Sequence, residues 1–375
     1  MLGSGELMEG AKRQAFAVIL AAGEGTRMRS SRPKPLARLC GKPMTAHIID
    51  SVFNAGVEEI VVVVGFKSDE VVESLTRYAP LGARLNFVEQ KSQRGTGDAV
   101  AAAMTALPDP ITFQGQLPPT VLVLPGDTPL IRSSTLVALL QSHAQGSAAV
   151  NVAYTELPDA SGYGRLIFGK SDTVLRIVEH KDASSQELEI TKVNSSVYAF
   201  SLDVILPALR RLNNQNSQGE YYLTDVIEIL VRAGYGVAGF RVEDANEVNG
   251  VNDRNQLSFV ERIMRERINA SFMSRGVNLV DPASIYIDST VDIGQDVTIW
   301  PGTFLVGRTS VGTGAEIGPE TRISNSTVGD GARVVRSDIE ECHVGEDAVV
   351  GPYAVLRAGA KVPANSSTGS FVVLE

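Results

Sequence analysis

Two glycines and two cations near residue 25 form the part of the sequence best suited to holding phosphate. Residues 17–21 are apolar and have the length of a buried strand, and a glycine-rich loop follows them. Within this loop, Gly23 and Gly25 allow tight turns whose backbone N–H groups face an anion. Arg27 and Lys34 add positive charge close by, as a triphosphate requires. The spacing matches neither the Walker A loop nor the dinucleotide-binding glycine motif.

A carboxylate follows a second segment of strand length. Residues 121–124 are apolar, and they lead directly into Gly126 and Asp127. Because parallel sheets bind ligands beyond the C-terminal ends of their strands, we expect Asp127 to lie beside the glycine-rich loop. Magnesium binds through one or two protein ligands together with substrate oxygens, so a carboxylate in this place suits Mg²⁺.

Short apolar segments alternate with helical segments in the first two thirds of the chain. The expected strands are residues 17–21, 59–64, 83–88 and 121–124, and the expected helices are residues 45–54, 71–77 and a segment that opens at 98. This alternation predicts βαβ units. It therefore predicts an α/β domain over residues 15–254, with a Rossmann-like, mainly parallel sheet.

The sequence changes character after residue 254. Residues 255–276 are predicted to form a linker helix, because apolar side chains recur there at spacings of three and four: Leu257, Val260, Met264 and Ile268. The alternative is an ordinary terminal helix of the first domain.

Residues 277–375 carry small aliphatic side chains at intervals of six, with slips of one residue. They are Ile287, Ile293, Ile299, Leu305, Val311, Ile317, Ile323, Val328, Val334, Ile339, Val344, Val350, Leu356 and Val362. This is a hexapeptide repeat, and it predicts a short left-handed parallel β-helix with three hexads in each coil. The repeat also accounts for many of the 35 glycines in the chain.

Composition argues against several other classes of protein. The formal net charge of −9 disfavours binding to nucleic acid, which depends on lysine and arginine. Cys40 and Cys342 form neither a disulfide framework nor a zinc motif, so a reducing, cytoplasmic location is expected. The longest apolar segments have strand length, which predicts no membrane span. Residues 1–14 lack the apolar core of a signal peptide and are expected to form a disordered extension.

Several motifs lie in order along nearly the whole chain. They are LAAGEGTRM at 20–28 followed by Lys34-Pro35, Gln90 with GTG at 95–97, GDTPL at 126–130, YGR at 163–165, VEHKDA at 178–183, GEYYLTD at 219–225 and GVN at 250–252. Together they resemble the bacterial bifunctional UDP-N-acetylglucosamine pyrophosphorylase / glucosamine-1-phosphate N-acetyltransferase family. The chain departs from the family pattern at two places. Pro125 stands where the family has an aromatic residue, and Ser195-Ser196 stand where it has Thr-Gly.

The resemblance implies roles for individual residues. Nucleotide binding is implied for Leu20, Ala21, Ala22, Gly23, Gly25, Lys34, Gln90, Gly95, Thr96 and Gly126. Sugar binding is implied for Gly164, Glu179, Asn194 and Asn252. Asp127 and Asn252 would hold Mg²⁺, and Arg27, Lys34 and Asp127 would be the catalytic residues.

The implied reaction is Mg²⁺-dependent uridylyl transfer. UTP and N-acetylglucosamine 1-phosphate would give UDP-N-acetylglucosamine, a cell-wall precursor, and pyrophosphate. The attacking phosphate oxygen is already ionised at neutral pH, so catalysis needs positioning and charge neutralisation but no general base. Accordingly, none of the four histidines is expected to be catalytic. The resemblance also implies a homotrimer that assembles through the β-helix.

Two alternatives stay open at this point. One is a nucleotidyltransferase for another sugar, such as glucose 1-phosphate with UTP or dTTP. The other is a non-catalytic regulatory subunit, although such subunits tend to lose the metal carboxylate or the loop arginine, and this chain keeps Asp127 and Arg27.

The acetyltransferase half of the family pattern is matched only at its beginning. Arg357 lies in a run that resembles part of the family's sugar-phosphate site. The family's later lysine, histidine, tyrosine and asparagine have no counterpart before Glu375. We therefore expect no acetyl transfer from glucosamine 1-phosphate and acetyl-CoA by these 375 residues.

Overall fold

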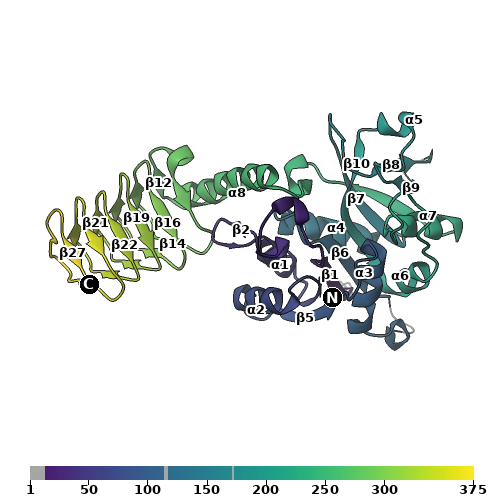
Figure 1. Ribbon diagram of the computed structural model, residues 1–375, viewed down its shortest axis with the longest axis horizontal. Coiled ribbons are helices and arrows are strands. Elements are labelled where there is room, and N and C mark those ends of the chain that lie inside the picture. Colours follow the sequence, from purple (N-terminus) through teal and green to yellow (C-terminus); the bar gives the residue numbers. More distant parts are fainter. Residues whose placement is uncertain (1–12, 114–116, 171–172) are drawn as a thin grey trace, which may run out of the picture. The chain divides into compact units, whose positions relative to one another are not determined.

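The computed structural model describes residues 13–113, 117–170 and 173–375, which form two compact units (Figure 1). The first unit contains the described chain up to Ala37 together with Pro43–Asp253. The second contains Arg38–Lys42 and Arg254–Glu375. The expected N-terminal extension, residues 1–14, lies outside the described residues except for its last two positions.

A nine-stranded sheet forms the centre of the first unit, and its strand order is β11-β7-β10-β6-β1-β4-β5, with β8 and β9 attached at β10. The strands are β1 (Ala15–Leu20), β4 (Glu59–Val64), β5 (Arg84–Glu89), β6 (Thr120–Pro125), β7 (Val150–Glu156), β8 (Arg165–Phe168), β9 (Val174–Val178), β10 (Lys192–Ser201) and β11 (Val237–Arg241). Strand β1 pairs in parallel with β4 and β6, whereas β10 runs antiparallel to β6 and β7. The predicted α/β fold with a mainly parallel sheet is confirmed.

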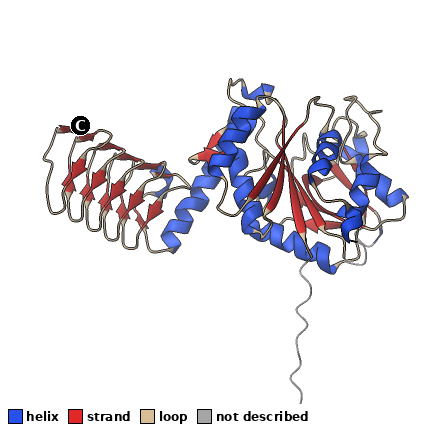
Figure 2. Ribbon diagram, turned by 90° about the horizontal axis from the view of Figure 1, so that it is seen from below, coloured by secondary structure: helices blue, strands red, loops and turns tan. Residues whose placement is uncertain are grey.

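Helices cover both faces of this sheet (Figure 2). They are α1 (Met44–Asn54), α2 (Ser68–Tyr78), α3 (Thr96–Ala103), α4 (Ser133–Gln145), α6 (Leu202–Leu209) and α7 (Asp225–Arg232). The short helix α5 (Ser185–Leu188) has no buried residue and covers neither face. Alternate residues of β1 enter different cores. Val18 packs with side chains of α3, α6 and α7, while Ala17 and Ile19 pack with side chains of α1, α2 and α4. Burial on both faces explains why the parallel strands are continuously apolar.

The second unit contains α8 (Arg254–Ser274) and a β-helix of three parallel sheets. It also contains most of the short strand pair β2 (Arg38–Leu39) and β3 (Lys42–Pro43), and the chain returns to the first unit at Pro43. One sheet contains β12 (Asn278–Leu279), β15 (Thr298–Ile299), β18 (Glu316–Ile317), β21 (Arg333–Val334) and β24 (Val349–Val350). A second contains β13 (Tyr286–Ile287), β16 (Phe304–Val306), β19 (Arg322–Ser324), β22 (Asp338–Glu340), β25 (Val355–Leu356) and β27 (Val373–Leu374). The third contains β14 (Asp292–Ile293), β17 (Ser310–Val311), β20 (Thr327–Val328), β23 (His343–Val344) and β26 (Lys361–Val362).

The aliphatic residues of the hexapeptide repeat form the core of the β-helix. All fourteen predicted positions are buried in one hydrophobic cluster. Ile287 pairs with Leu305 in the next coil, and Ile323 pairs with Ile339. The first pair spans a full coil of three hexads, and the second spans a coil shortened by the slips in the repeat. The spacing of the aliphatic residues therefore predicts that these side chains point inward, and it also predicts which coils contain fewer residues.

None of the helices in the described part of the chain is both long and apolar enough to cross a membrane.

A buried histidine in the first unit makes its stability depend on pH. His143 of α4 is fully buried, with Nδ1 3.0 Å from Asn151 Oδ1 and Nε2 3.4 Å from Ser201 Oγ. Burial lowers the pKa of His143 from 6.5 to about 4. As the pH falls below 6.5, the unfolded chain therefore takes up a proton that the folded chain refuses, and the native state loses stability.

We expect this histidine to cost about 2 kcal/mol of stability between pH 7 and pH 5. His143→Gln should flatten that part of the pH profile, because glutamine does not titrate. Thermal melting of both proteins across this pH range is the measurement. Parallel profiles for the variant and the wild type would contradict the assignment.

Candidate active site

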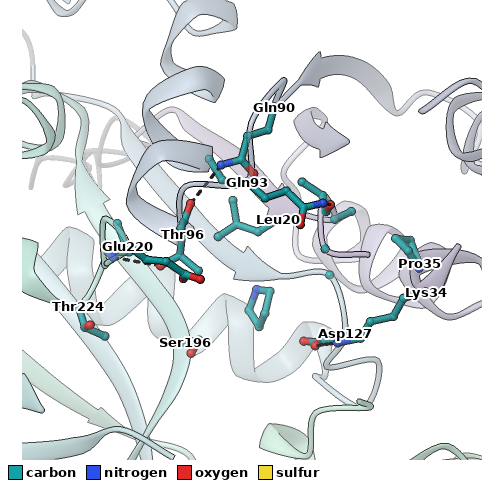
Figure 3. Close-up of a pocket in the computed structure, with 18 of the residues that line it drawn as sticks. Leu20, Lys34, Pro35, Gln90, Gln93, Thr96, Asp127, Ser196, Glu220 and Thr224 are labelled. Atoms are coloured by element: carbon teal, nitrogen blue, oxygen red, sulfur yellow. Dashed lines mark hydrogen bonds and ion pairs between the residues drawn. The ribbon is translucent and has the colours of Figure 1, made fainter. Parts of the chain in front are cut away.

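A cavity of about 440 Å³ opens at the C-terminal ends of β1 and β6, where the sequence places its phosphate-binding loop and its carboxylate (Figure 3). Its lining consists of Leu20, Ala21, Ala22, Gly23, Lys34, Pro35, Gln90, Gln93, Gly95, Thr96, Ala99, Pro125, Gly126, Asp127, Glu179, Ser196, Tyr198, Glu220, Leu223 and Thr224. This is the position at which open α/β sheets hold their ligands.

Backbone hydrogen bonds fix the glycine-rich loop at the edge of the sheet. The Gly126 N–H donates to the Leu20 carbonyl at 2.8 Å, and Gln93 Nε2 donates to the Ala22 carbonyl at 2.9 Å. Gly25 has a positive φ of 66°, and a Cβ there would collide with the side chain of Lys34. A glycine at this position therefore lets Lys34 lie directly against the loop.

Four polar residues from distant parts of the sequence meet at the mouth of the cavity. Lys34 Nζ forms an ion pair with Asp127 and lies 2.9 Å from Asn252 Oδ1. Arg27 Nη2 donates to the same Asn252 oxygen at 3.0 Å. The Val251 N–H donates to the Asp127 carbonyl at 2.8 Å, which places the segment bearing Asn252 beside Asp127. The predicted catalytic residues and both predicted metal ligands thus form one cluster.

The chemistry of this cluster fits a divalent cation. The ammonium of Lys34 occupies a position between a carboxylate oxygen and an amide oxygen. Oxygen ligands of these kinds are those that Mg²⁺ prefers. Within residues 13–113, 117–170 and 173–375, no group of three or more His, Cys, Asp or Glu side chains could hold a metal ion by itself. Substrate oxygens would have to complete the coordination of a cation bound here.

One end of the cavity presents the residues predicted to contact the base. Gln90 is buried, and its Nε2 donates to the Gly95 carbonyl at 3.2 Å. Thr96 Oγ1 accepts a hydrogen bond from the Leu223 N–H at 3.0 Å, so the loop at 95–97 is fastened to the GEYYLTD motif. Figure 3 shows Gln90 and Thr96 on the same side of the cavity, away from Lys34 and Asp127.

Gly95 has no room for a side chain. Its φ is 113°, and a Cβ would lie 2.5 Å from the carbonyl oxygen and 2.8 Å from the nitrogen of Tyr221. Because these are backbone atoms, Gly95→Ala should displace the loop and lower kcat/KM for the nucleotide by about 100-fold. Steady-state kinetics check this expectation. Gly234→Ala is the matched control, since Gly234 also has a positive φ of 87° but no atom within 4 Å, and it should lose little activity.

Three of the four residues predicted to bind the sugar, Gly164, Glu179 and Asn194, lie close together, whereas Asn252 belongs to the cluster around Lys34. A Cβ on Gly164 would be 3.5 Å from Asn194 Cβ and 3.6 Å from Glu179 Oε2. Glu179 lines the cavity, and its Oε1 accepts a hydrogen bond from Thr224 Oγ1 at 3.0 Å. Burial raises the pKa of Glu179 above its usual value. A hydrogen-bonded carboxyl group in this place is suited to receiving sugar hydroxyl or amide N–H groups.

Asn194 lies behind the cavity wall, where it supports two lining residues. Its Nδ2 donates to the hydroxyl of Tyr198 at 2.7 Å, and its Oδ1 accepts from the Ser196 N–H at 3.1 Å. Ser196 sits at an irregularity in β10 with a φ of 59°, which is unusual for a residue other than glycine. Where the family pattern has glycine, this chain therefore has a serine with a left-handed backbone conformation in the lining of the cavity.

The structure adds lining residues that sequence reasoning missed. Glu220, Leu223 and Thr224 belong to the GEYYLTD motif, for whose members the resemblance implies no individual role. Gln93 and Tyr198 have no local signal, since only the folded chain brings them to the cavity. Five predicted residues lie beside the lining instead of within it: Gly25, Arg27, Gly164, Asn194 and Asn252.

Comparison with known proteins gives a consistent set of relatives. The model of the nucleotidyl transferase family matches residues 16–270. The chain is 40% identical to the bifunctional protein GlmU of Halalkalibacterium halodurans over 357 residues, which cover 95% of this chain and 76% of that protein. It is 43% identical to GlmU of Exiguobacterium sibiricum, covering 95% and 77% of the two chains. It is 42% identical to GlmU of Mycolicibacterium smegmatis, covering 96% and 74%.

Proposed function

Because this chain belongs to the nucleotidyl transferase family and, within it, to the bifunctional GlmU proteins, we propose that it joins UTP to N-acetylglucosamine 1-phosphate. The products are UDP-N-acetylglucosamine and pyrophosphate, and the reaction supplies a precursor of the cell wall. The observation that carries this proposal is the convergence of Arg27, Lys34, Asp127 and Asn252 at the mouth of a cavity bounded by the glycine-rich loop.

The arrangement suits in-line transfer of a nucleotidyl group. A phosphate oxygen of the sugar 1-phosphate attacks the α-phosphorus of UTP, and the bond from that phosphorus to the bridging oxygen breaks. Pyrophosphate leaves with the electron pair. Arg27 and Lys34 neutralise the charge that collects on the phosphates, and the loop N–H groups hold them in place. No side chain has to remove a proton.

We further propose that Asp127 and Asn252 hold Mg²⁺. When bound, the ion would polarise the phosphate oxygens and neutralise part of their charge. Both side chains direct oxygen atoms at Lys34 Nζ, which supports a cation position between them. Lys34 would then move its ammonium toward the phosphates of the substrate.

The identity of the sugar is tested by a substrate panel. N-acetylglucosamine 1-phosphate and glucose 1-phosphate are each offered with UTP and with dTTP, and pyrophosphate release is measured with and without Mg²⁺. We expect the highest kcat/KM for N-acetylglucosamine 1-phosphate with UTP. A preference for glucose 1-phosphate would support the alternative sugar nucleotidyltransferase, and no release with any pair would support a regulatory subunit.

We also propose a homotrimer assembled through the β-helix. Aromatic side chains remain exposed on one of its sheets, where Tyr286 and Phe304 stack with ring centroids 4.6 Å apart. Exposed stacked aromatic residues are typical of surfaces that bind another protein. Sedimentation analysis of the purified protein tests this, because a trimer has three times the mass of the chain and a monomer would contradict the proposal.

A further inference from the structure

The side-chain amide of Gln90 is held in one orientation by two oxygen atoms. Its Nε2 donates to the Gly95 carbonyl at 3.2 Å and to Asp98 Oδ2 at 2.9 Å. Carbonyl and carboxylate oxygens only accept hydrogen bonds, so the nitrogen end of the amide must face them. Both N–H groups of Gln90 are then used, and the polar atom left for a ligand in the cavity is Oε1.

Asp98 is itself held in place. It lies in the first turn of α3, where a negative charge is stabilised by the N-terminal end of the helix. Its other oxygen, Oδ1, accepts from Arg94 Nη2 at 2.6 Å. The Asp98 side chain is only 17% exposed, whereas that of Arg94 is 62% exposed. Its position on α3 and its low exposure therefore fix Asp98 without relying on the exposed Arg94, and Asp98 offers Gln90 an acceptor that has no N–H or O–H group of its own.

A fixed Oε1 at this point selects among pyrimidine bases. Uracil and thymine carry an N–H at ring position 3, and this group can donate to a carbonyl oxygen. Cytosine carries a lone pair at the same position, so two acceptors would face each other without a proton between them. Burying such a pair leaves both atoms unsatisfied, which is costly in a site shielded from water.

We propose that Asp98 is a positioning residue that gives the site its preference for a base with an N–H at ring position 3. It acts through Gln90 and touches no reacting atom. This proposal rests on the proposed function in one respect, namely that the base of the nucleotide binds beside Gln90. It names the class of base accepted, namely uracil or thymine, and excludes cytosine.

Equilibrium binding of UTP and CTP to the whole chain tests the proposal without relying on turnover. The wild type should bind UTP about 100-fold more tightly than CTP. Asp98→Asn places both a donor and an acceptor beside Gln90, so the Gln90 side-chain amide can flip and present its N–H groups to the base. The ratio of UTP affinity to CTP affinity should then fall at least about tenfold, mainly because CTP binds better. Asp98→Ala should lower the UTP-to-CTP affinity ratio similarly, because only the longer bond to the Gly95 carbonyl then holds the Gln90 amide.

Arg94→Ala is the matched control, because it removes the ion pair but leaves the bond from Gln90 to Asp98. Its UTP-to-CTP ratio should stay within about twofold of the wild type. The proposal is overturned if both Asp98 variants keep the wild-type ratio, or if Arg94→Ala changes the ratio as much as Asp98→Asn does. A parallel turnover assay reports on the proposed function separately. Loss of the ratio in an enzyme that makes no nucleotide sugar would support the role of Asp98 and contradict the proposed reaction.

Discussion

Asp127→Asn is expected to lower kcat for pyrophosphate release by about 1,000-fold or more while the fold stays intact. Asparagine keeps the shape of the side chain but removes its negative charge. That charge pairs with Lys34 in the cluster and, in our account, holds Mg²⁺ together with Asn252. The loss should appear in kcat measured with saturating substrates, and added Mg²⁺ should restore little of it.

The matched control for this variant is Asp69→Asn. Asp69 lies in the first turn of α2, on an exposed part of the first unit outside the cavity lining. The Asp69→Asn variant should keep nearly all of the activity, since this substitution removes the same charge from a residue that does not line the cavity. An Asp127→Asn enzyme with more than about a tenth of wild-type turnover would contradict the metal assignment.

Lys34→Met is expected to lower kcat by about 100-fold to 1,000-fold. Methionine fills much the same volume without the ammonium group, so the loop keeps its packing while the phosphates lose a cation. The requirement for Mg²⁺ should behave differently. Lys34 Nζ occupies the position between Asp127 and Asn252, so its removal leaves both oxygens more accessible. The concentration of Mg²⁺ at half-maximal activity should therefore stay the same or fall.

Lys67→Met controls for the loss of a lysine as such. Lys67 bonds to the Ser31 carbonyl and to Glu70 near the surface, and it does not line the cavity. Its variant should retain near wild-type kcat and Mg²⁺ dependence. If Lys34→Met kept wild-type kcat but needed much more Mg²⁺, lysine would be assisting the metal ligands, and its assignment to the phosphates would be wrong.

The parts of the fold that follow local patterns were predictable from the sequence. Strands β1, β4 and β6 are continuously apolar because helices cover both faces of the sheet, so their sequences alone indicate that they are buried. The β-helix is a still clearer case, because each coil repeats the same packing and every coil adds evidence for the next. Helix ends were less certain. The second helix begins at Ser68, three residues before the position expected from the apolar spacing.

The order of strands was not predictable in this way. Strand β10 lies between β6 and β7 and is antiparallel to both. Nothing in its own residues distinguishes that place from an edge of the sheet, because pairing depends on partners distant in sequence. The same limit applies to Tyr198 of β10, which lines the cavity and whose hydroxyl accepts a hydrogen bond from Asn194.

Local sequence patterns also could not show which residues of the site contact one another. The resemblance named Arg27, Lys34, Asp127 and Asn252 one by one, but only the fold shows that two cations share the Asn252 oxygen. The role of Asn194 illustrates the reverse case. Its side chain supports Ser196 and Tyr198 from behind the lining, which a motif match could not reveal. Motifs thus identify residues, whereas hydrogen-bond partners decide which of them face the ligand.

Radiolabelled UTP provides the most direct test of the proposed reaction. The purified chain is incubated with N-acetylglucosamine 1-phosphate and Mg²⁺, together with UTP labelled in either its α- or its γ-phosphate. We predict that the α label appears in UDP-N-acetylglucosamine and the γ label in pyrophosphate, in equal amounts and only when the sugar phosphate is present. Release of inorganic phosphate without a labelled nucleotide sugar, or turnover that does not depend on the sugar phosphate, would contradict it.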